Sequence, residues 1–269
     1  MTVNDMTRSG AISSDVIGRW LPFRTQTGAE PGALTLYCLP HAGGGASAYR
    51  VWQRKLPGVA VQPVQPPGRE NRHREPAYER MAPLVCDLAD VLLADVALGP
   101  VGRPYAVYGH SLGALVTFEL LREIRRRGAP EPVHLFVSGC VAPHHPFDDG
   151  PPVGRMTRPE MVELLRSLGG TPDWLLSDPS VLEMIIPTMR ADFSVKETYQ
   201  YYYELPLDIP ITALPSTADP RAGQGQVARW KEQTTQEFAL HTFVGGHFAV
   251  FEQAALTHKY ISEALRQWV

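Results

Sequence analysis

The sequence predicts an α/β fold built on a mostly parallel sheet, and two observations carry this prediction. Short apolar runs typical of buried strands alternate with amphipathic helical stretches along most of the chain. This alternation is typical of a parallel sheet flanked by helices. The second observation is the turn GHSLG at 109–113, which lies between one such strand and the helix that follows it.

Four strand-like runs share high apolar content before residue 145: ALTLYCLP (33–40), VAVQPVQ (59–65), PYAVYGHS (104–111) and VHLFVSGCVAP (133–143). Between them, apolar residues recur at helical spacing over 81–96 and along one face of 112–128. Gly128 is a suitable C-terminal stop for the second of these helices. The order strand, helix, strand therefore holds on both sides of the GHSLG turn.

The alternation breaks at 146–205, where the patterns are helical and show no clear strand. Pro187 is expected to kink or restart a helix within this segment. Strands resume at 209–216 and 238–246, and an amphipathic helix covers 252–268. The predicted organisation is a flexible N-terminal tail at 1–18, a core of 19–145 and 206–269, and a helical lid insertion at 146–205.

Composition excludes several classes of protein. The net charge of −3 argues against nucleic acid as a partner. The three cysteines, Cys38, Cys86 and Cys140, lie far apart in apolar runs, so we expect buried thiols rather than disulfides or a metal site. The first 18 residues have no apolar core of a signal peptide, and no run is long enough to span a membrane. We therefore expect a cytoplasmic protein that does not bind membranes.

The pattern G-x-S-x-G in this context predicts a nucleophile elbow, with Ser111 exposed at a sharp strand-to-helix turn. A serine hydroxyl needs a neighbouring base, and the base needs an orienting acid. In α/β-hydrolases these follow in the chain order Ser, Asp, His, on loops after later strands. Asp219 after ITALP and His247 after FALHTF satisfy that order.

Each partner has a plainer interpretation when it is taken alone. Asp219 precedes a proline, which is typical of a turn, and His247 could be an ordinary loop histidine. Their order and their positions at strand ends favour a catalytic triad. His41, His110, His144 and His145 are weaker candidates for the base because none follows a late strand, and no carboxylate or cysteine cluster supports a metal at His144 and His145.

Acyl transfer also needs donors for the developing oxyanion. The backbone N–H of Leu112, directly after the serine, should be one of them. The glycine-rich loop PHAGGGAS (40–47) follows an early strand and should supply the other. Flexible turn formation is the plainer role for this loop, and no phosphate-binding lysine follows it.

Several segments together resemble the motifs of type II thioesterases, the stand-alone editing enzymes of polyketide synthases and non-ribosomal peptide synthetases. The segments are LPHAGGGASAYRVW, PPGRENRHREP, YGHSLGALVTFEL, LRSLGGTP, PTMRADFSVKETYQYY, PLDIPITAL and GGHFAVFE. The resemblance covers residues 19–269 and implies an α/β-hydrolase fold with a helical lid.

The resemblance implies a serine thioesterase that hydrolyses acyl thioesters from the phosphopantetheine arm of acyl or peptidyl carrier proteins, with no cofactor or metal of its own. Carried over by position, Ser111 is the nucleophile, His247 the base and Asp219 the acid. The resemblance implies that Ala42 and Leu112 give the oxyanion N–H groups. The family's Gly-Asp pair before the acid is absent here, and Arg69 of the PGR motif has no role that the sequence explains.

Three other functions stay open: a general serine esterase on free esters, a chain-releasing thioesterase, and a non-catalytic α/β-hydrolase relative, which the complete triad disfavours. The tyrosines of 199–203 could line an acyl passage or pack the lid. The arginines of 122–127 could attract an acidic carrier protein or complement the helix dipole, and the latter is favoured.

Overall fold

The structure is a computed structural model that describes residues 12–24, 34–146 and 152–269. Within these residues six strands form one sheet in the order β2-β1-β3-β4-β5-β6, and every neighbouring pair is parallel. The strands are β1 (Leu34–Leu39), β2 (Val59–Pro63), β3 (Tyr105–His110), β4 (Leu135–Ser138), β5 (Ile211–Leu214) and β6 (Phe238–Leu240). The predicted parallel sheet is confirmed.

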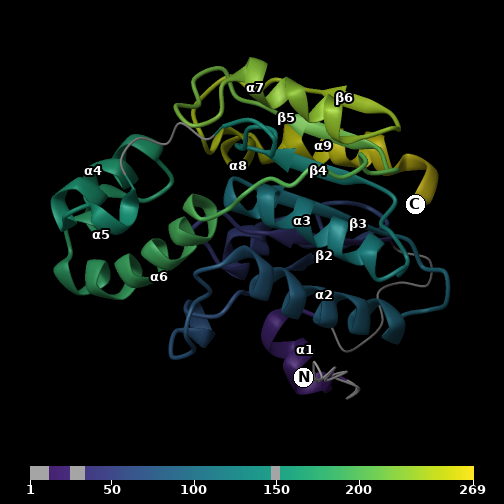
Figure 1. The fold of residues 1–269 in the computed structure, drawn as a ribbon, viewed down its shortest axis with the longest axis horizontal. Coiled ribbons are helices and arrows are strands. Elements are labelled where there is room, and N and C mark those ends of the chain that lie inside the picture. Colours follow the sequence, from purple (N-terminus) through teal and green to yellow (C-terminus); the bar gives the residue numbers. More distant parts are fainter. Residues whose placement is uncertain (1–11, 25–33, 147–151) are drawn as a thin grey trace, which may run out of the picture.

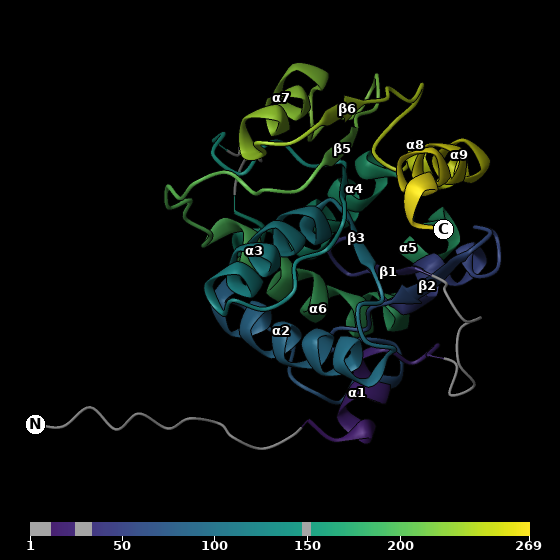
Figure 2. The same ribbon diagram turned by 90° about the vertical axis from the view of Figure 1, so that its right-hand side faces the viewer.

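Helices cover both faces of this sheet (Figures 1 and 2). One face carries α1 (Ser14–Trp20), α2 (Met81–Leu98) and α3 (Leu112–Arg126). The other carries the 3₁₀ helix η1 (Ala46–Trp52), α8 (Ala249–Glu252) and α9 (Ala254–Leu265). The short helix α7 (Gln224–Ala228) follows β5. The C-terminal helix predicted over 252–268 corresponds to α9 and the 3₁₀ turn Arg266–Trp268 that follows it, and α8 precedes it.

Strand β1 shows why the strands read as continuous apolar runs. Leu36 and Cys38 belong to the core cluster on the α9 side, whereas Tyr37 and Leu39 belong to the cluster under α2 and α3. All six residues of β1 are buried. A strand that is covered on both faces has no solvent-facing position that would select polar side chains.

Within the described residues, three α-helices lie between β4 and β5 in the chain: α4 (Arg158–Leu168), α5 (Asp173–Leu176) and α6 (Pro179–Glu197). We call them the insertion helices; Figure 1 shows them at the left, beside the sheet. They share an apolar cluster of their own, which includes Met161, Leu165, Ile186 and Phe193. The sequence predicted a kink or a restart at Pro187. Helix α6 does not restart there, because it runs without a break from Pro179 to Glu197.

The N-terminal segment differs from the prediction of a flexible tail over 1–18. Residues 1–11 lie outside the described residues, but α1 begins at Ser14, and Ser13 caps it by accepting a hydrogen bond from the Val16 N–H at 3.3 Å. Ile17 is fully buried and Trp20 is 4% exposed. Burial of these two side chains against α2 and its neighbours holds the segment on the core. Among the described helices, none is long and apolar enough to cross a membrane.

Candidate active site

Ser111 occupies a strained turn between β3 and α3. Its φ of 55° and ψ of −120° are unusual for a residue with a side chain. The two flanking glycines are required by close packing. A Cβ on Gly109 would lie 2.3 Å from the Gly113 carbonyl oxygen, and a Cβ on Gly113 would lie 2.3 Å from the Leu39 carbonyl oxygen. The structure therefore has the geometry of a nucleophile elbow at GHSLG.

Asp219 and His247 are hydrogen-bonded on the segments that follow β5 and β6. The His247 Nδ1 and Asp219 Oδ2 atoms are 2.8 Å apart, and both side chains are buried. The other Asp219 oxygen accepts a hydrogen bond from the Arg221 backbone N–H at 2.8 Å. A carboxylate only accepts hydrogen bonds, so Nδ1 must donate, and the Nε2 of the neutral ring keeps its lone pair.

Ser111 and His247 face one small cavity of about 20 Å³, which is room for about one water molecule. Leu112 and Ala42 line the same cavity. Side chains of α4 and α6 close it from the insertion side: Leu168, Asp192, Phe193 and Lys196. The structure thus brings together all five residues that the sequence selected, and it places insertion helices over the serine.

Within the described residues, the backbone N–H groups of Ala42 and Leu112 have no backbone acceptor outside regular secondary structure. Both residues line the Ser111 cavity. Ala42 begins the turn after β1 in which the Gly44 N–H donates to the His41 carbonyl at 2.9 Å. The structure thus places both residues that the sequence selected as oxyanion donors at the wall of the Ser111 cavity.

The other candidate histidines do not contact Asp219. Burial lowers the pKa of His41 to about 3, with repulsion from His247 as a smaller cause, so His41 is neutral at neutral pH. Burial also holds the pKa of His110 well below its ordinary value, and His110 Nδ1 lies 2.8 Å from the Ser138 hydroxyl. His144 Nδ1 lies 2.7 Å from the Gln233 side-chain amide. Among the histidines named here, His247 is the one that is hydrogen-bonded to Asp219 and lines the Ser111 cavity.

Two other aspartates, Asp208 and Asp192, are engaged with partners other than His247. Asp208 is held by Thr235 and Gln236 on the surface. Asp192 lines the Ser111 cavity, but both its oxygens accept hydrogen bonds from the Arg69 guanidinium. Sequence reasoning missed the contact between Arg69 and Asp192 at this site. The sequence shows both residues in the recognised PPGR and RADF segments. It does not show that they would pair, because they lie 123 residues apart in the chain.

The arginines at the end of α3 hold neighbouring segments rather than forming a free positive surface. All four have acidic partners: Glu119, Glu123, Asp90 and Glu204. Arg125 also donates to the Leu205 and Pro206 carbonyls, which fastens the segment after α6 to α3. In the same segment the Tyr199 hydroxyl donates to Glu119 at 2.8 Å, and none of the tyrosines at 199–203 lines the Ser111 cavity. These contacts favour structural roles for both groups.

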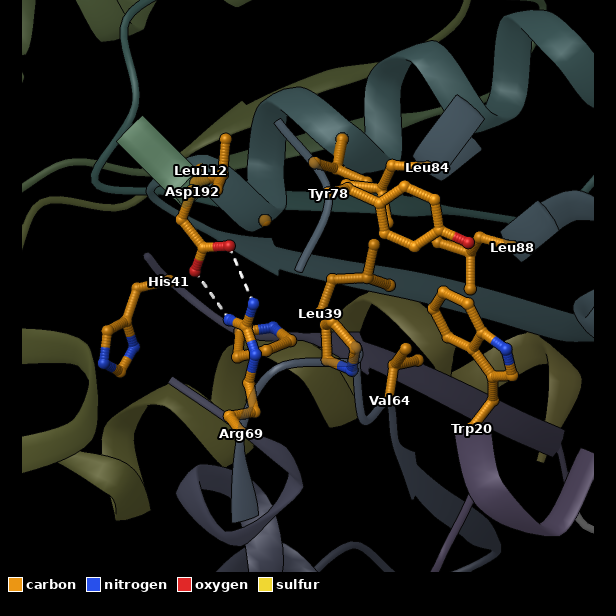
Figure 3. A pocket seen from close by; sticks show the side chains of 14 residues that line it. Trp20, Leu39, His41, Val64, Arg69, Tyr78, Leu84, Leu88, Leu112 and Asp192 are labelled. Atoms are coloured by element: carbon orange, nitrogen blue, oxygen red, sulfur yellow. Dashed lines mark hydrogen bonds and ion pairs between the residues drawn. The ribbon is translucent and has the colours of Figure 1, made fainter. Parts of the chain in front are cut away.

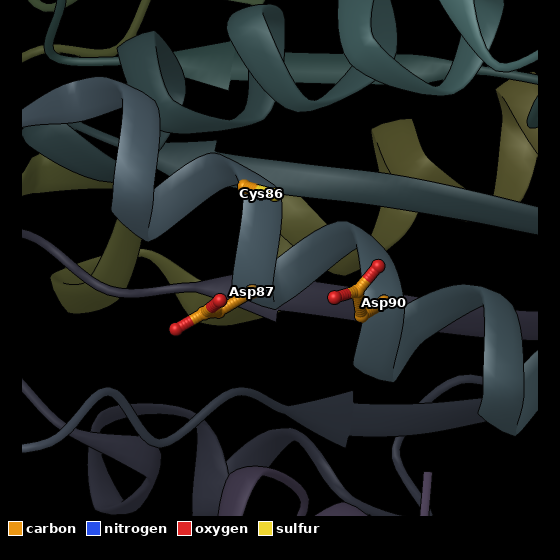
Figure 4. A group of neighbouring side chains, drawn as sticks. All are labelled: Cys86, Asp87 and Asp90. Atoms are coloured by element: carbon orange, nitrogen blue, oxygen red, sulfur yellow. The ribbon is translucent and has the colours of Figure 1, made fainter. Parts of the chain in front are cut away.

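Cys86, Asp87 and Asp90 lie together on α2 (Figure 4), with potential ligand atoms within 4.8 Å of one another. The Arg127 guanidinium lies beside this group. Its Nη1 donates to Asp90 Oδ1 at 2.6 Å, and its Nη2 lies 3.4 Å from the Cys86 sulfur. The guanidinium already supplies positive charge to this group. Cys38 and Cys140 are buried as predicted, but Cys86 is exposed because it faces away from the buried Leu84 and Leu88 side of the helix.

Comparisons with known proteins find one family. A thioesterase domain model matches residues 34–264. The chain is 38% identical over 255 residues to linear gramicidin dehydrogenase LgrE of Brevibacillus parabrevis, covering 93% of this chain and 94% of that protein. It is 36% identical over 233 residues to thioesterase PikA5 of Streptomyces venezuelae, covering 84% and 78%. The solved type II thioesterase BorB from the borrelidin biosynthetic cluster superposes with a TM-score of 0.81 at 36% identity, covering 94% and 99%.

Proposed function

The chain belongs to the thioesterase domain family, and from that premise we propose that it hydrolyses acyl thioesters on the phosphopantetheine arm of carrier proteins. The predicted family, α/β-hydrolase fold and enzyme class are confirmed. We place its role in editing, the removal of aberrant acyl groups from a polyketide synthase or a non-ribosomal peptide synthetase. One observation carries the chemistry: Ser111 at a strained elbow shares a cavity with His247, which is bonded to buried Asp219.

In the proposed acylation step, the Ser111 hydroxyl attacks the thioester carbonyl carbon and His247 Nε2 takes its proton. Asp219 holds the imidazole in the tautomer that can accept this proton and stabilises the imidazolium. The carbonyl oxygen becomes an oxyanion, which the N–H groups of Ala42 and Leu112 stabilise. The carbon–sulfur bond then breaks, and His247 returns its proton to the departing pantetheine thiol.

In the proposed deacylation step, a water molecule replaces the thiol. His247 removes a proton from this water as the water attacks the ester carbonyl of acylated Ser111. Collapse of the second tetrahedral intermediate releases the free carboxylic acid, and the proton returns to the serine oxygen. Neither proposed step needs a metal or a separate cofactor. The only prosthetic group in the reaction is the pantetheine arm of the substrate. We also propose that the enzyme is cytoplasmic, because the first 18 residues have no apolar core of a signal peptide.

The insertion, residues 146–205, would serve as a lid over this reaction. The cavity of about 20 Å³ is too small for an acyl group and a pantetheine thiol together. Leu168 of α4 and Phe193 of α6 line this cavity, so substrate entry would require these helices to move. Closing them again afterwards would exclude bulk water.

The dehydrogenase activity in the name of the relative LgrE does not fit the site of this chain. A dinucleotide would place its pyrophosphate against the glycine-rich loop after the first strand. In this chain that loop faces carboxylates instead. Glu70 accepts a hydrogen bond from the Ser47 N–H at 3.2 Å, and Asp192 accepts one from the Gly43 N–H at 2.6 Å. Two carboxylates on these donors would repel a pyrophosphate.

Intact-mass measurement of a panel of acyl-carrier proteins tests the proposal. The wild-type enzyme should remove the acyl mass from carriers that bear short acyl groups and leave the pantetheine arm in place. The same acyl groups as ethyl esters should be poor substrates. Rapid hydrolysis of the ethyl esters with no change in the carrier masses would instead identify a general esterase.

A further inference from the structure

A buried ion pair joins the insertion helices to the loop after β2 (Figure 3). Arg69 Nη1 lies 2.6 Å from Asp192 Oδ2 and Nη2 lies 2.7 Å from Oδ1, so the contact is bidentate. Each side chain is only 7% exposed. Withdrawing two charges from water costs free energy that their attraction often fails to recover. A pair of this kind is therefore weak evidence for stability and calls for another explanation.

The same two side chains hold the loop that follows β1. The Gly43 N–H donates to Asp192 Oδ2 at 2.6 Å, and Arg69 Nη1 donates to the Gly44 carbonyl at 3.0 Å. Gly43 directly follows Ala42, whose N–H is the proposed oxyanion donor. The ion pair thus holds the Gly43 N–H and the Gly44 carbonyl, which lie within two residues of the Ala42 N–H.

Contacts from one face of α6 reinforce this arrangement. Gly43 has a φ of +74°, and a Cβ placed on it would lie 2.0 Å from the Met189 sulfur, so the helix packs directly on the loop. The Thr188 hydroxyl donates to the Gly68 carbonyl at 2.5 Å, next to Arg69. Asp192, Arg69 and Leu112 also line a second cavity of about 30 Å³ (Figure 3). Displacement of α6 would break all of these contacts together.

We propose that Arg69 and Asp192 are positioning residues that couple docking of α6 to the geometry of the oxyanion loop. When α6 is docked, Asp192 holds the Gly43 N–H and Arg69 holds the Gly44 carbonyl, so the Ala42 N–H points toward the serine. When α6 moves away to admit substrate, the loop loses this carboxylate and the oxyanion hole is incomplete. Full hydrolytic capacity then exists only in the closed enzyme, in the manner of induced fit. This inference rests on the proposed function.

The test is the double variant Arg69→Met/Asp192→Leu, which replaces the ion pair by apolar side chains of similar length and leaves no unpaired charge. Such replacements are often neutral for stability. We expect a thermal midpoint close to that of the wild type, a KM for carrier substrate within about threefold, and a kcat lowered by roughly 10- to 1,000-fold, since loss of one oxyanion donor costs about 10²–10³. Phosphonate labelling of Ser111 should slow in parallel, because the phosphonyl oxygen needs the same donors.

Arg72→Met/Glu75→Leu is the matched control. This pair is also bidentate, with contacts of 3.0 and 2.6 Å, and lies in the same segment, but it does not touch Gly43 or Gly44. Its kcat should stay within about threefold of the wild type. Arg69→Lys is a second test that keeps the charge but lacks the planar fork, and its kcat should fall about tenfold.

Two outcomes would overturn the inference. One is a wild-type kcat in folded Arg69→Met/Asp192→Leu, or in Arg69→Lys if the double variant does not fold. The other is an equal loss of kcat in the Arg72 control, which would mean that any disturbance of this segment impairs the enzyme. Ser111→Ala in parallel separates the two proposals. Activity that survives Ser111→Ala refutes the proposed function, whereas activity lost there but retained in the Arg69 variants refutes only the coupling.

Discussion

Gly113→Ala should damage both stability and activity, because the elbow leaves no space for a methyl group. The added Cβ would lie 2.3 Å from the Leu39 carbonyl oxygen and 2.6 Å from the Pro40 carbonyl oxygen. Both are backbone atoms that no side-chain rotation can move. An ordinary contact is 3.4–4 Å, so α3 and the end of β1 must separate by about 1 Å. Overpacking of this kind costs about 1–3 kcal/mol, and we expect the upper end.

The thermal midpoint of Gly113→Ala should fall by about 6–12 °C, from 2–4 °C for each kcal/mol in a chain of this size. The displacement also separates Leu112 from Ala42, so kcat should fall about 100-fold, the effect of a misplacement of about 1 Å. Gly18→Ala in α1 is the control, since nothing lies within 4 Å of its added Cβ. It should be neutral or stabilising by up to about 1 kcal/mol. A wild-type midpoint and kcat in Gly113→Ala would refute the packing argument.

Three further predictions concern the acid, the substrate and the pH dependence of stability. Asp219→Asn should keep the fold but lower kcat by roughly 10²–10⁴-fold through misorientation of His247; full activity would assign the acid elsewhere. The kcat/KM for an acyl group on a carrier protein should exceed that for the same group on N-acetylcysteamine, and shortening the insertion should erode this preference while Ser111 still reacts with a small phosphonate. Equal values with the insertion intact would favour the general esterase. Burial lowers the pKa of His134 to about 4, so the unfolded chain takes up a proton between about pH 6.5 and 4 that the native state does not. The free energy of unfolding should therefore decrease as the pH is lowered through that window, by roughly 3 kcal/mol for this group. His134→Gln should flatten the slope of the urea-derived unfolding free energy, and an unchanged slope would count against this assignment.

The elbow and its two partners could be predicted because each depends on local patterns and on one topological rule. Periodicity located the strands before Ser111, Asp219 and His247, and parallel strands bring their carboxyl ends to one edge of the sheet. Chain order then selected the aspartate and the histidine. The structure adds the 2.8 Å contact between His247 and Asp219, which no spacing could provide.

The ion pair could not be predicted, because periodicity does not say how an insertion folds back on the core. Arg69 and Asp192 lie in segments that had been recognised, but their contact depends on the docking of α6 onto two loops. The short helix α1 was missed because seven residues give too little periodicity, although Ser13 is a favourable N-cap. The exposed Cys86 was a different error: helical spacing alone places it opposite Leu84 and Leu88.

An acyl group covalently bound to Ser111 is the most direct test of the central claim. An acylated carrier protein is mixed with the wild-type enzyme, the reaction is quenched in acid within milliseconds to seconds, and the peptides are analysed by mass. We predict the mass of the acyl group on the peptide that contains Ser111, its disappearance as free acid accumulates, and neither species with Ser111→Ala. Release of free acid at the wild-type rate by Ser111→Ala, or acylation confined to another residue, would contradict the account.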